Sequence, residues 1–187
     1  MVLEGRVRLP HKASVSSEGE VVRRKEQAEG TERIPHELRR RVLAEQGDWY
    51  SFRMILIGNY YSGELFATLA RDYGMLRDDF LILAYLSDFG EMTANLICAL
   101  SGRPKNSISR GVIKLTGNKL VEARAGTEDR RYTFLNVTAE GRRMYEETIA
   151  LFREREQEVF GCLTVKEKQS LDKALTKVLE NWFAKHG

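Results

Sequence analysis

The residues best suited to chemistry lie between Arg103 and Arg131, and the chemistry that they indicate is the binding of an anion. This stretch holds eight Lys or Arg residues and three acids, so its net charge is +5, whereas the whole 187-residue chain carries +3. Asp129, Arg130 and Arg131 directly precede the alternating run Tyr132–Val137, which is typical of a strand. Arginines at the tip of a hairpin suit an anionic partner, and a local basic surface favours nucleic acid.

A helix expected at about 105–117 presents two different faces. Its apolar stripe consists of Ile108, Val112 and Leu115. The opposite face carries Asn106, Arg110 and Ile113, and the positions that flank it are Ser107, Ser109 and Lys114. One side of the helix therefore enters a core, while the other offers amide, hydroxyl, guanidinium and ammonium groups. An ordinary solvated surface has the same pattern, so this helix alone leaves both interpretations open.

The elements that must position these side chains begin with a long helical pattern after Pro35. Apolar residues recur at spacings near three and four from about 36 to 73. Gly58 and Gly63 weaken this pattern and could kink or break the helix. Gly74 is expected to end it.

A helix-turn-helix is expected to follow. A short helix at 77–87 precedes a third helix with Thr93 as its N-cap. Ser101-Gly102 ends the third helix, and Pro104 fits the first turn of the helix at about 105–117. Two helices joined by a glycine turn, the second with a polar outer face, have the layout of a DNA-reading motif.

The rest of the chain predicts a wing and two more helices. Leu120-Val121 and Phe134–Val137 are expected to form a hairpin. One helix is expected from Thr138 to about Cys162, and the next begins with the capping box Thr164…Glu167. The apolar face of the last helix consists of Leu171, Leu175, Val178, Leu179, Trp182 and Phe183.

The predicted fold is mainly α with a small β-hairpin wing. Residues 75–138 are expected to form a winged helix-turn-helix DNA-binding domain. Residues 34–74 and 139–187 are expected to form a helical dimerisation region, because their apolar faces are too wide for a small winged domain to cover. Residues 1–33 lack a lasting period and are expected to be a mobile tail.

Several classes of function are not favoured by the sequence. No secretory signal is visible, and the longest apolar stretch, Phe80–Leu86, is too short to cross a membrane, which predicts a cytoplasmic protein. Cys98 and Cys162 lack disulfide or metal-ligand spacing, and the three histidines are scattered, so neither a metal nor a cofactor is expected. The chain has no nucleophile–base pair and no Gly-rich phosphate loop. Asp78-Asp79 are interpreted as a first-turn feature of a helix, and an enzyme is not expected.

The order of these elements resembles the MarR family of bacterial transcription regulators (multiple antibiotic resistance regulators) over about residues 36–187. The resemblance is carried by "MTANLICALSGRPKNSISRGVIKLTGNKLVEAR" and "DRRYTFLNVTAEGRR". Lys119 stands where the family usually has a glycine, and Asn118 is expected to carry the left-handed turn instead. Ala123 replaces a common basic residue.

The resemblance implies a homodimeric, sequence-specific DNA-binding regulator, most often a repressor, on a pseudo-palindromic double-stranded operator. The expected DNA-binding residues are Lys105, Asn106, Ser107, Ser109, Arg110, Lys114, Arg124, Asp129, Arg130 and Arg131. The wing tip would enter the minor groove, where arginines are favoured. Asp129 would pair with a neighbouring arginine rather than contact DNA.

The resemblance also implies a small aromatic effector, such as a phenolic acid or its thioester. The expected lining is Trp49, Phe52, Arg53, Tyr60, Tyr61 and Phe80, because an arginine among aromatic side chains suits an aromatic carboxylate. The alternatives are that these aromatics are plain core, that Cys98 or Cys162 makes the regulator redox-responsive, and that the winged helix is a protein-interaction module.

Overall fold

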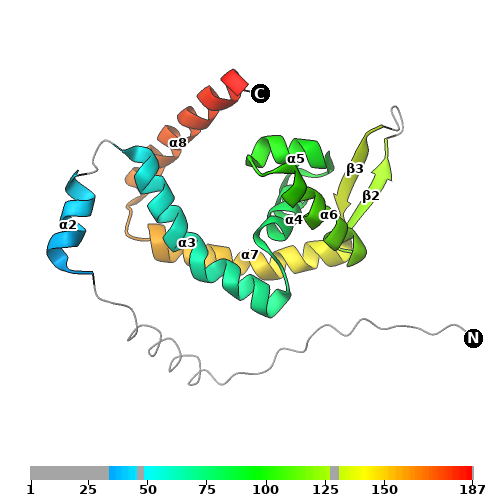
Figure 1. The fold of residues 1–187 in the computed structure, drawn as a ribbon, viewed down its shortest axis with the longest axis horizontal. Helices are drawn as coiled ribbons and strands as arrows, with labels where there is room; N and C mark the ends of the chain where they lie inside the picture. Colours follow the sequence, from blue (N-terminus) through cyan, green and yellow to red (C-terminus); the bar gives the residue numbers. More distant parts are fainter. Residues whose placement is uncertain (1–33, 46–48, 127–130, 187) are drawn as a thin grey trace, which may run out of the picture. The chain divides into compact units, whose positions relative to one another are not determined.

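The computed structural model describes residues 34–45, 49–126 and 131–186. Helices make up most of these residues and a small antiparallel sheet completes the fold, as the sequence predicted (Figure 1). The elements in chain order are α2 (His36–Glu45), α3 (Tyr50–Tyr73), α4 (Arg77–Phe89), β1 (Met92–Thr93), α5 (Ala94–Ser101), α6 (Lys105–Gly117), β2 (Val121–Ala125), β3 (Thr133–Val137), α7 (Ala139–Phe160) and α8 (Val165–His186). The predicted tail, 1–33, lies outside the described residues.

The chain divides into two units, Met1–Phe52 and Arg53–Gly187. The described part of the first unit is α2 with the first residues of α3. Leu38 and Leu43 of α2 are about half exposed, and the ion pairs along this helix are on its surface, where such pairs contribute little stability. The predicted dimerisation and DNA-binding regions are functional divisions, and they stay a prediction.

The long helical pattern predicted for 36–73 is carried by two helices, α2 and α3. Within α3 the helix passes through Gly58 and Gly63 without interruption, so neither glycine breaks it. Gly74 follows with a φ of 60°, in the left-handed region that glycine occupies at little cost, and it ends the helix as expected.

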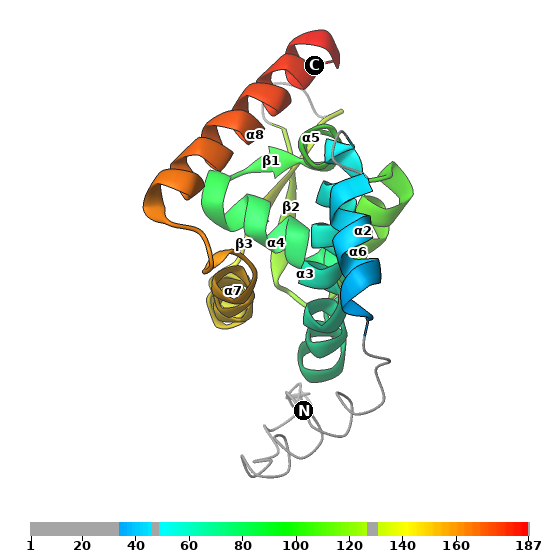
Figure 2. The same cartoon turned by 90° about the vertical axis from the view of Figure 1, so that its left-hand side faces the viewer.

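The core of the second unit is built around α4. Ile82, Leu83 and Leu86 of this helix are completely buried, and α4 packs against α6, α7 and β3 (Figure 2). α6 contributes Ile108 and Leu115, which are 0 and 2% exposed. The apolar stripe predicted for α6 therefore enters this core.

The sheet has the strand order β1-β3-β2 and is antiparallel throughout. Val121 pairs with Val137 at one end of the hairpin, and Ala125 pairs with Thr133 at the other. β1, which pairs Met92 with Leu135, was not predicted, because two residues are too few to show alternation.

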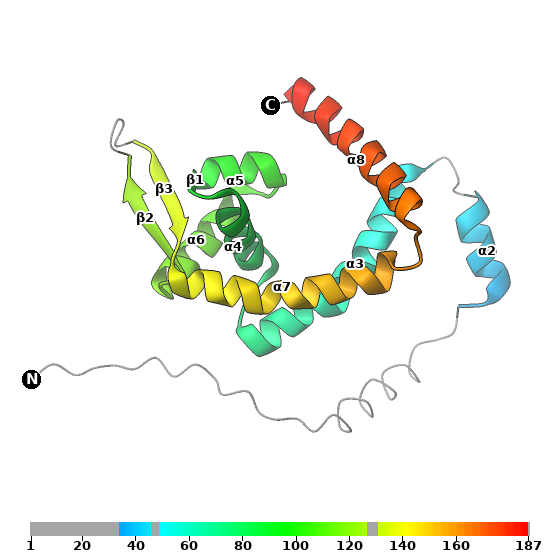
Figure 3. The ribbon, with the colours of Figure 1, turned by 180° about the vertical axis from the view of Figure 1, so that it is seen from behind.

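α7 is tied to α4 by aromatic side chains, and it continues the chain from the end of β3 (Figure 3). The rings of Phe80 and Phe152 stack with centroids 3.8 Å apart. The Tyr145 hydroxyl donates to the Asp88 carboxylate at 2.7 Å. Burial, together with this hydrogen bond, raises the pKa of Tyr145 to about 12. These contacts fix α7, which follows the wing, against α4, which packs against α6.

Thr138 and Gly141, which follow β3, join the end of the hairpin to its start. The Thr138 hydroxyl donates to the Lys119 carbonyl at 2.8 Å and accepts from the Gly141 N–H at 3.0 Å. A Cβ atom at Gly141 would lie 2.0 Å from the Leu120 carbonyl oxygen, a distance that no side chain can accommodate. Glycine here lets the start of α7 lie directly against the start of the hairpin.

The prediction that Asn118 carries the left-handed turn before the wing was wrong. Asn118 has a φ of −85°, whereas Lys119 has a φ of 59°. Lys119 is the one non-glycine residue with positive φ in the described part of the chain. The Lys119 N–H donates to the Thr116 carbonyl, and the Leu120 N–H donates to the Leu115 carbonyl. These two hydrogen bonds end α6 with the left-handed conformation at Lys119 and not at Asn118. An L-residue pays a steric cost in this conformation.

Replacing Lys119 with glycine is therefore expected to stabilise the protein. The gain should be about 0.5–1 kcal/mol, because the relief of the left-handed strain exceeds the extra entropy of glycine in the unfolded chain. Urea unfolding of the full chain measures it. Lys119→Ala is the matched control, since it removes the same charge but keeps the Cβ. Equal stability of the two variants would contradict the prediction.

Candidate nucleic-acid interface

The site begins with a buried carboxylate in the first turn of α4. Asp79 is 2% exposed. Its Oδ2 accepts from the Leu76 N–H at 2.8 Å and from the Lys114 ammonium at 2.5 Å. The same ammonium donates to the Gly74 carbonyl at 2.7 Å. Lys114 therefore ties α6 to the start of α4 and does not extend toward the outer face, which the sequence analysis expected it to flank.

The neighbouring carboxylate holds the turn that leads into α6. Arg103 donates to both oxygens of Asp78, at 2.6 and 3.0 Å, and this hydrogen bonding raises the pKa of Arg103 further above its usual range. The bidentate geometry fixes the orientation of the guanidinium as well as its position. Asp78 and Asp79, which we call the α4 aspartate pair, thus secure α6 at its N-terminal approach and near its C-terminal end.

Gly111 lets the two helices approach closely between these anchors. A Cβ atom there would lie 2.7 Å from the Ile82 side chain and 3.3 Å from Asp79 Oδ1. Because the buried side of α6 is fixed in this way, its opposite side has one defined orientation. The residues on that opposite side are Asn106, Arg110 and Ile113, and all three are exposed.

The flanks of this outer face are mixed. Lys105 is exposed at the first position of α6, and Ser107 and Ser109 are half-buried. The side chains that face outward provide a guanidinium, an ammonium and a carboxamide, and such groups bind phosphates and the edges of bases. This part of the predicted site is brought together by one helix.

The wing contributes one arginine that is engaged by an acid. Arg124, on β2, lies 2.6 Å from the Glu91 carboxylate, which directly precedes β1. This hydrogen bond raises the pKa of Arg124. The pair spans the sheet, since β1 and β2 flank β3. Glu91 was not part of the predicted site, because only the pairing of β1 brings it near Arg124.

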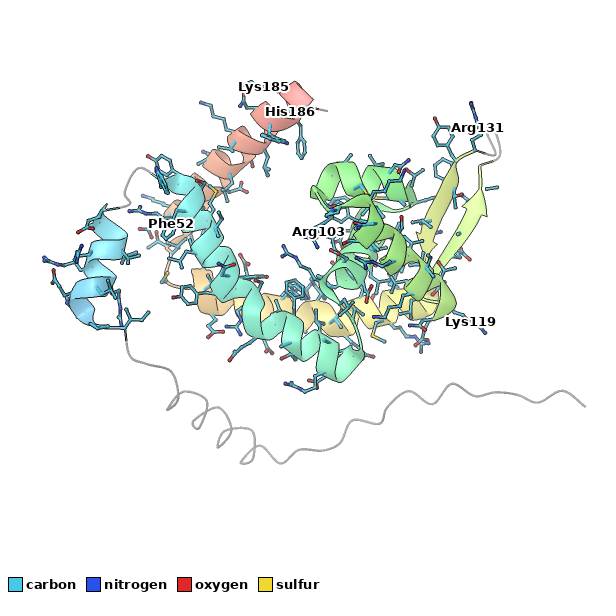
Figure 4. All side chains as sticks on the ribbon, viewed as in Figure 1. Phe52, Arg103, Lys119, Arg131, Lys185 and His186 are labelled. Carbon is cyan, nitrogen blue, oxygen red and sulfur yellow. The ribbon has the colours of Figure 1, made fainter. Side chains whose placement is uncertain are left out.

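The tip of the wing is described in part. Asp129 and Arg130 lie outside the described residues, so their predicted roles stay predictions. The hairpin closes with a hydrogen bond from the Gly126 N–H to the Tyr132 carbonyl at 2.8 Å. Arg131 is exposed, and Figure 4 places it at the tip of the wing, at the opposite end of the hairpin from Lys119.

Solved structures of transcription regulators share this arrangement of elements. A MarR-family transcriptional regulator from Silicibacter pomeroyi is 23% identical, with a TM-score of 0.67 over 74% of this chain and 94% of its own. The transcriptional regulator BldR from Sulfolobus solfataricus is 20% identical, with a TM-score of 0.64 over 74% of this chain and 98% of its own. The chain has the MarR fold. No family model and no curated protein matches it by sequence, so the likeness rests on structure.

A third solved structure that is similar to this chain is that of BpsR from Bordetella bronchiseptica. It is 19% identical, with a TM-score of 0.55 over 67% of this chain and 98% of its own. The DNA binding of BpsR is regulated by 6-hydroxynicotinic acid. The likeness to these three proteins confirms the predicted fold.

In this version of the MarR fold, the local positive charge is smaller than the sequence indicated. Three acids from outside residues 103–131 pair with three cations inside it, namely Asp78 with Arg103, Asp79 with Lys114, and Glu91 with Arg124. Including these acids lowers the net charge from +5 to +2. The other described cations of the stretch are Lys105, Arg110, Lys119 and Arg131. The sequence could not tell which cations pair with Asp78, Asp79 and Glu91, because that depends on how the core packs.

The residues predicted to line an effector site are distributed over both units. Trp49 and Phe52 belong to the first unit, and Trp49 is 68% exposed. In the second unit, Arg53 and Tyr60 are exposed on α3 and Tyr61 is half-buried, with its hydroxyl 3.5 Å from the Phe152 carbonyl. Phe80 differs from the expectation, because its ring is buried in the core and stacked on Phe152. The alternative that it is plain core describes this residue correctly.

None of the helices in the described residues is long and apolar enough to cross a membrane. Those residues also contain no cluster of His, Cys, Asp or Glu that could hold a metal ion.

Substituting Lys114 tests the α4 aspartate pair. Lys114→Met should destabilise the protein by about 2 kcal/mol, because it leaves the buried Asp79 carboxylate without its cation. Lys105→Met, on the same helix, is the matched control and should change stability by no more than about 0.5 kcal/mol, since Lys105 is exposed. Thermal or urea unfolding measures both. If the two variants unfold alike, Lys114 does not anchor α6.

Proposed function

We propose that this protein is a DNA-binding transcription regulator that reads double-stranded DNA with α6 and its wing. The observation that carries this proposal is the outer face of α6. Asn106 and Arg110 are exposed there on a helix whose other side is fixed by the α4 aspartate pair. The MarR fold supports the proposal, because the regulators named above are built on it.

The chemistry of the exposed groups suits this task. Arginine forms bidentate hydrogen bonds with guanine, and asparagine does so with adenine, in the major groove. Lys105 lies where it can neutralise a phosphate, a contact that adds affinity without sequence information. Arg131, at the wing tip, suits the adjacent minor groove. Three exposed cations, Lys105, Arg110 and Arg131, thus lie on α6 and the wing tip, the surface that is proposed to read DNA.

A protein-interaction module is the competing function. It would present an apolar or mixed outer face on α6, and the lowered charge of +2 weakens one argument against it. The cations paired with the acids that lower this charge, however, are Arg103, Lys114 and Arg124. None of these is on the outer face of α6. That face is mixed in polarity, since it carries Ile113, but the exposed Lys105 and Arg110 give it a positive charge, which favours DNA.

The functional unit is proposed to be a homodimer. No described residue of α8 is buried, and its apolar side chains are 36–58% exposed from Leu171 to Phe183. An apolar face of that length is unfavourable in water. A second copy of the chain would cover it and would present α6 twice, so the DNA site should be pseudo-palindromic, with half-sites about one helical turn apart.

Selection from random double-stranded DNA tests the proposal with the full chain. The wild type should enrich a two-fold symmetric site. Arg110→Ala should weaken binding to that site by about 1–3 kcal/mol and relax one base position in each half-site. The control is Arg153→Ala, an equal charge change on the exposed surface of α7, which should leave the selected sequence unchanged.

Failure of the wild type to enrich any site would overturn the proposed function. Enrichment of an asymmetric single site would overturn the homodimer instead. Equal effects of Arg110→Ala and Arg153→Ala would show that charge, and not the position of Arg110, accounts for binding.

Regulation is proposed to be repression that a small aromatic acid relieves. The support is that 6-hydroxynicotinic acid regulates DNA binding of BpsR, which has the same fold, and that Arg53 and Tyr60 lie seven residues apart on one face of α3. A guanidinium and a phenol about 10 Å apart along one helix face can contact the carboxylate and the ring of the same aromatic acid. Because Phe80 is buried, we leave it out of the proposed effector contacts.

Calorimetry with 6-hydroxynicotinic acid and a panel of phenolic acids and their thioesters tests this regulation. At least one compound should bind below millimolar concentration and weaken DNA binding, and Arg53→Ala should reduce both effects. Arg77→Ala is the control, since Arg77 is exposed elsewhere in the same unit. An effector that weakens DNA binding 100-fold requires about 2.7 kcal/mol of coupling. Absence of binding by the whole panel would contradict an aromatic effector.

A further inference from the structure

An exposed isoleucine lies on the proposed reading face. Ile113 is 72% exposed, more than any other isoleucine in the described residues. Its neighbours in the sequence do not share this exposure, since Val112 packs against the core and Leu115 is buried. A single exposed apolar side chain is common on protein surfaces. Ile113 differs from such a case because it lies beside exposed polar residues of α6 that are proposed to contact DNA.

Ile113 lies in one row with Asn106 and Arg110. These positions are separated by four and three residues, so their side chains project from the same side of a helix with 3.6 residues per turn. The buried residues Ile108, Gly111 and Leu115 occupy the opposite side. The row is therefore the part of α6 that is farthest from the core, and any partner that meets Arg110 also meets Ile113.

The length of helix from Asn106 to Ile113 is close to the length of about three base pairs of DNA. Seven residues of helix span about 10 Å, which is roughly three base-pair steps of about 3.4 Å each. Within that length the row offers a carboxamide, a guanidinium and a branched apolar group. The apolar feature that base pairs expose in the major groove is the C5-methyl group of thymine.

We propose that Ile113 is a specificity-determining residue that contacts the methyl group of a thymine in each half-site, next to the base pair that Arg110 reads. This inference rests on the proposed DNA-binding function and extends it to the base composition of the operator. Isoleucine is a poorer helix former than Arg, Lys, Gln or Glu, any of which could occupy an exposed helix position. Contact with a methyl group gives this apolar side chain a favourable environment that water does not provide.

Replacing thymine with uracil tests the contact, because uracil lacks only the methyl group. In the site selected by the wild type, each thymine is replaced in turn and the affinity of the full chain is measured. One position per half-site should lose about fourfold in affinity, the value expected for one buried methyl or methylene group. Ile113→Ala should bind the thymine and uracil sites equally at that position.

The matched control is Ile55→Ala, the same substitution at an isoleucine of α3 that is 63% exposed. It should retain the wild-type sensitivity to uracil whatever its overall affinity. The inference is overturned if the selected site has no thymine beside the Arg110-dependent base pair, if uracil has no effect, or if Ile113→Ala keeps the full effect. Those outcomes leave DNA binding itself intact. Failure to select any site would instead overturn the proposed function, and the inference with it.

Discussion

The α4 aspartate pair is the constraint on which the proposed reading surface depends. Asp79 is almost completely buried, yet it receives a backbone N–H and the Lys114 ammonium, while Asp78 holds Arg103 through two hydrogen bonds. A buried carboxylate without such partners would be strongly unfavourable. The two adjacent acids therefore lock α6 in one orientation against α4, and that orientation decides which of its side chains face outward.

The basic residues of this region consequently have two separate roles. Arg103 and Lys114 stabilise the helix-turn-helix through their ion pairs with the α4 aspartate pair. Arg124 joins the two edges of the sheet through its ion pair with Glu91. Lys105, Arg110 and Arg131 keep their exposure on α6 and the wing tip. Positive charge alone binds nucleic acid without regard to sequence. A surface with few cations, placed beside an amide and an apolar group, is better suited to discriminate between sequences.

The wing is positioned by equally specific contacts at its base. Thr138 joins the end of β3 to the chain that precedes β2, and Gly141 allows the start of α7 to lie against Leu120. The strained Lys119 turns the chain from α6 into this arrangement. The angle of the wing relative to α6 is thus set by hydrogen bonds and by close backbone approach, and not by the wing's own short strands.

The sequence by itself determined most of the helices, several of their N-terminal caps and the hairpin, because apolar periodicity, Thr93, Thr138 and the box at Thr164 act over a few residues. It also identified the outer face of α6 from the spacing of Ile108 and Leu115. Tertiary structure alone decided that Lys119 and not Asn118 takes the left-handed turn, that Phe80 is buried, and which cations are paired. Asp78 is 25 residues from Arg103, and Asp79 is 35 residues from Lys114. Such partners meet only when the core packs, so no local pattern could separate the structural cations from those that remain exposed on α6.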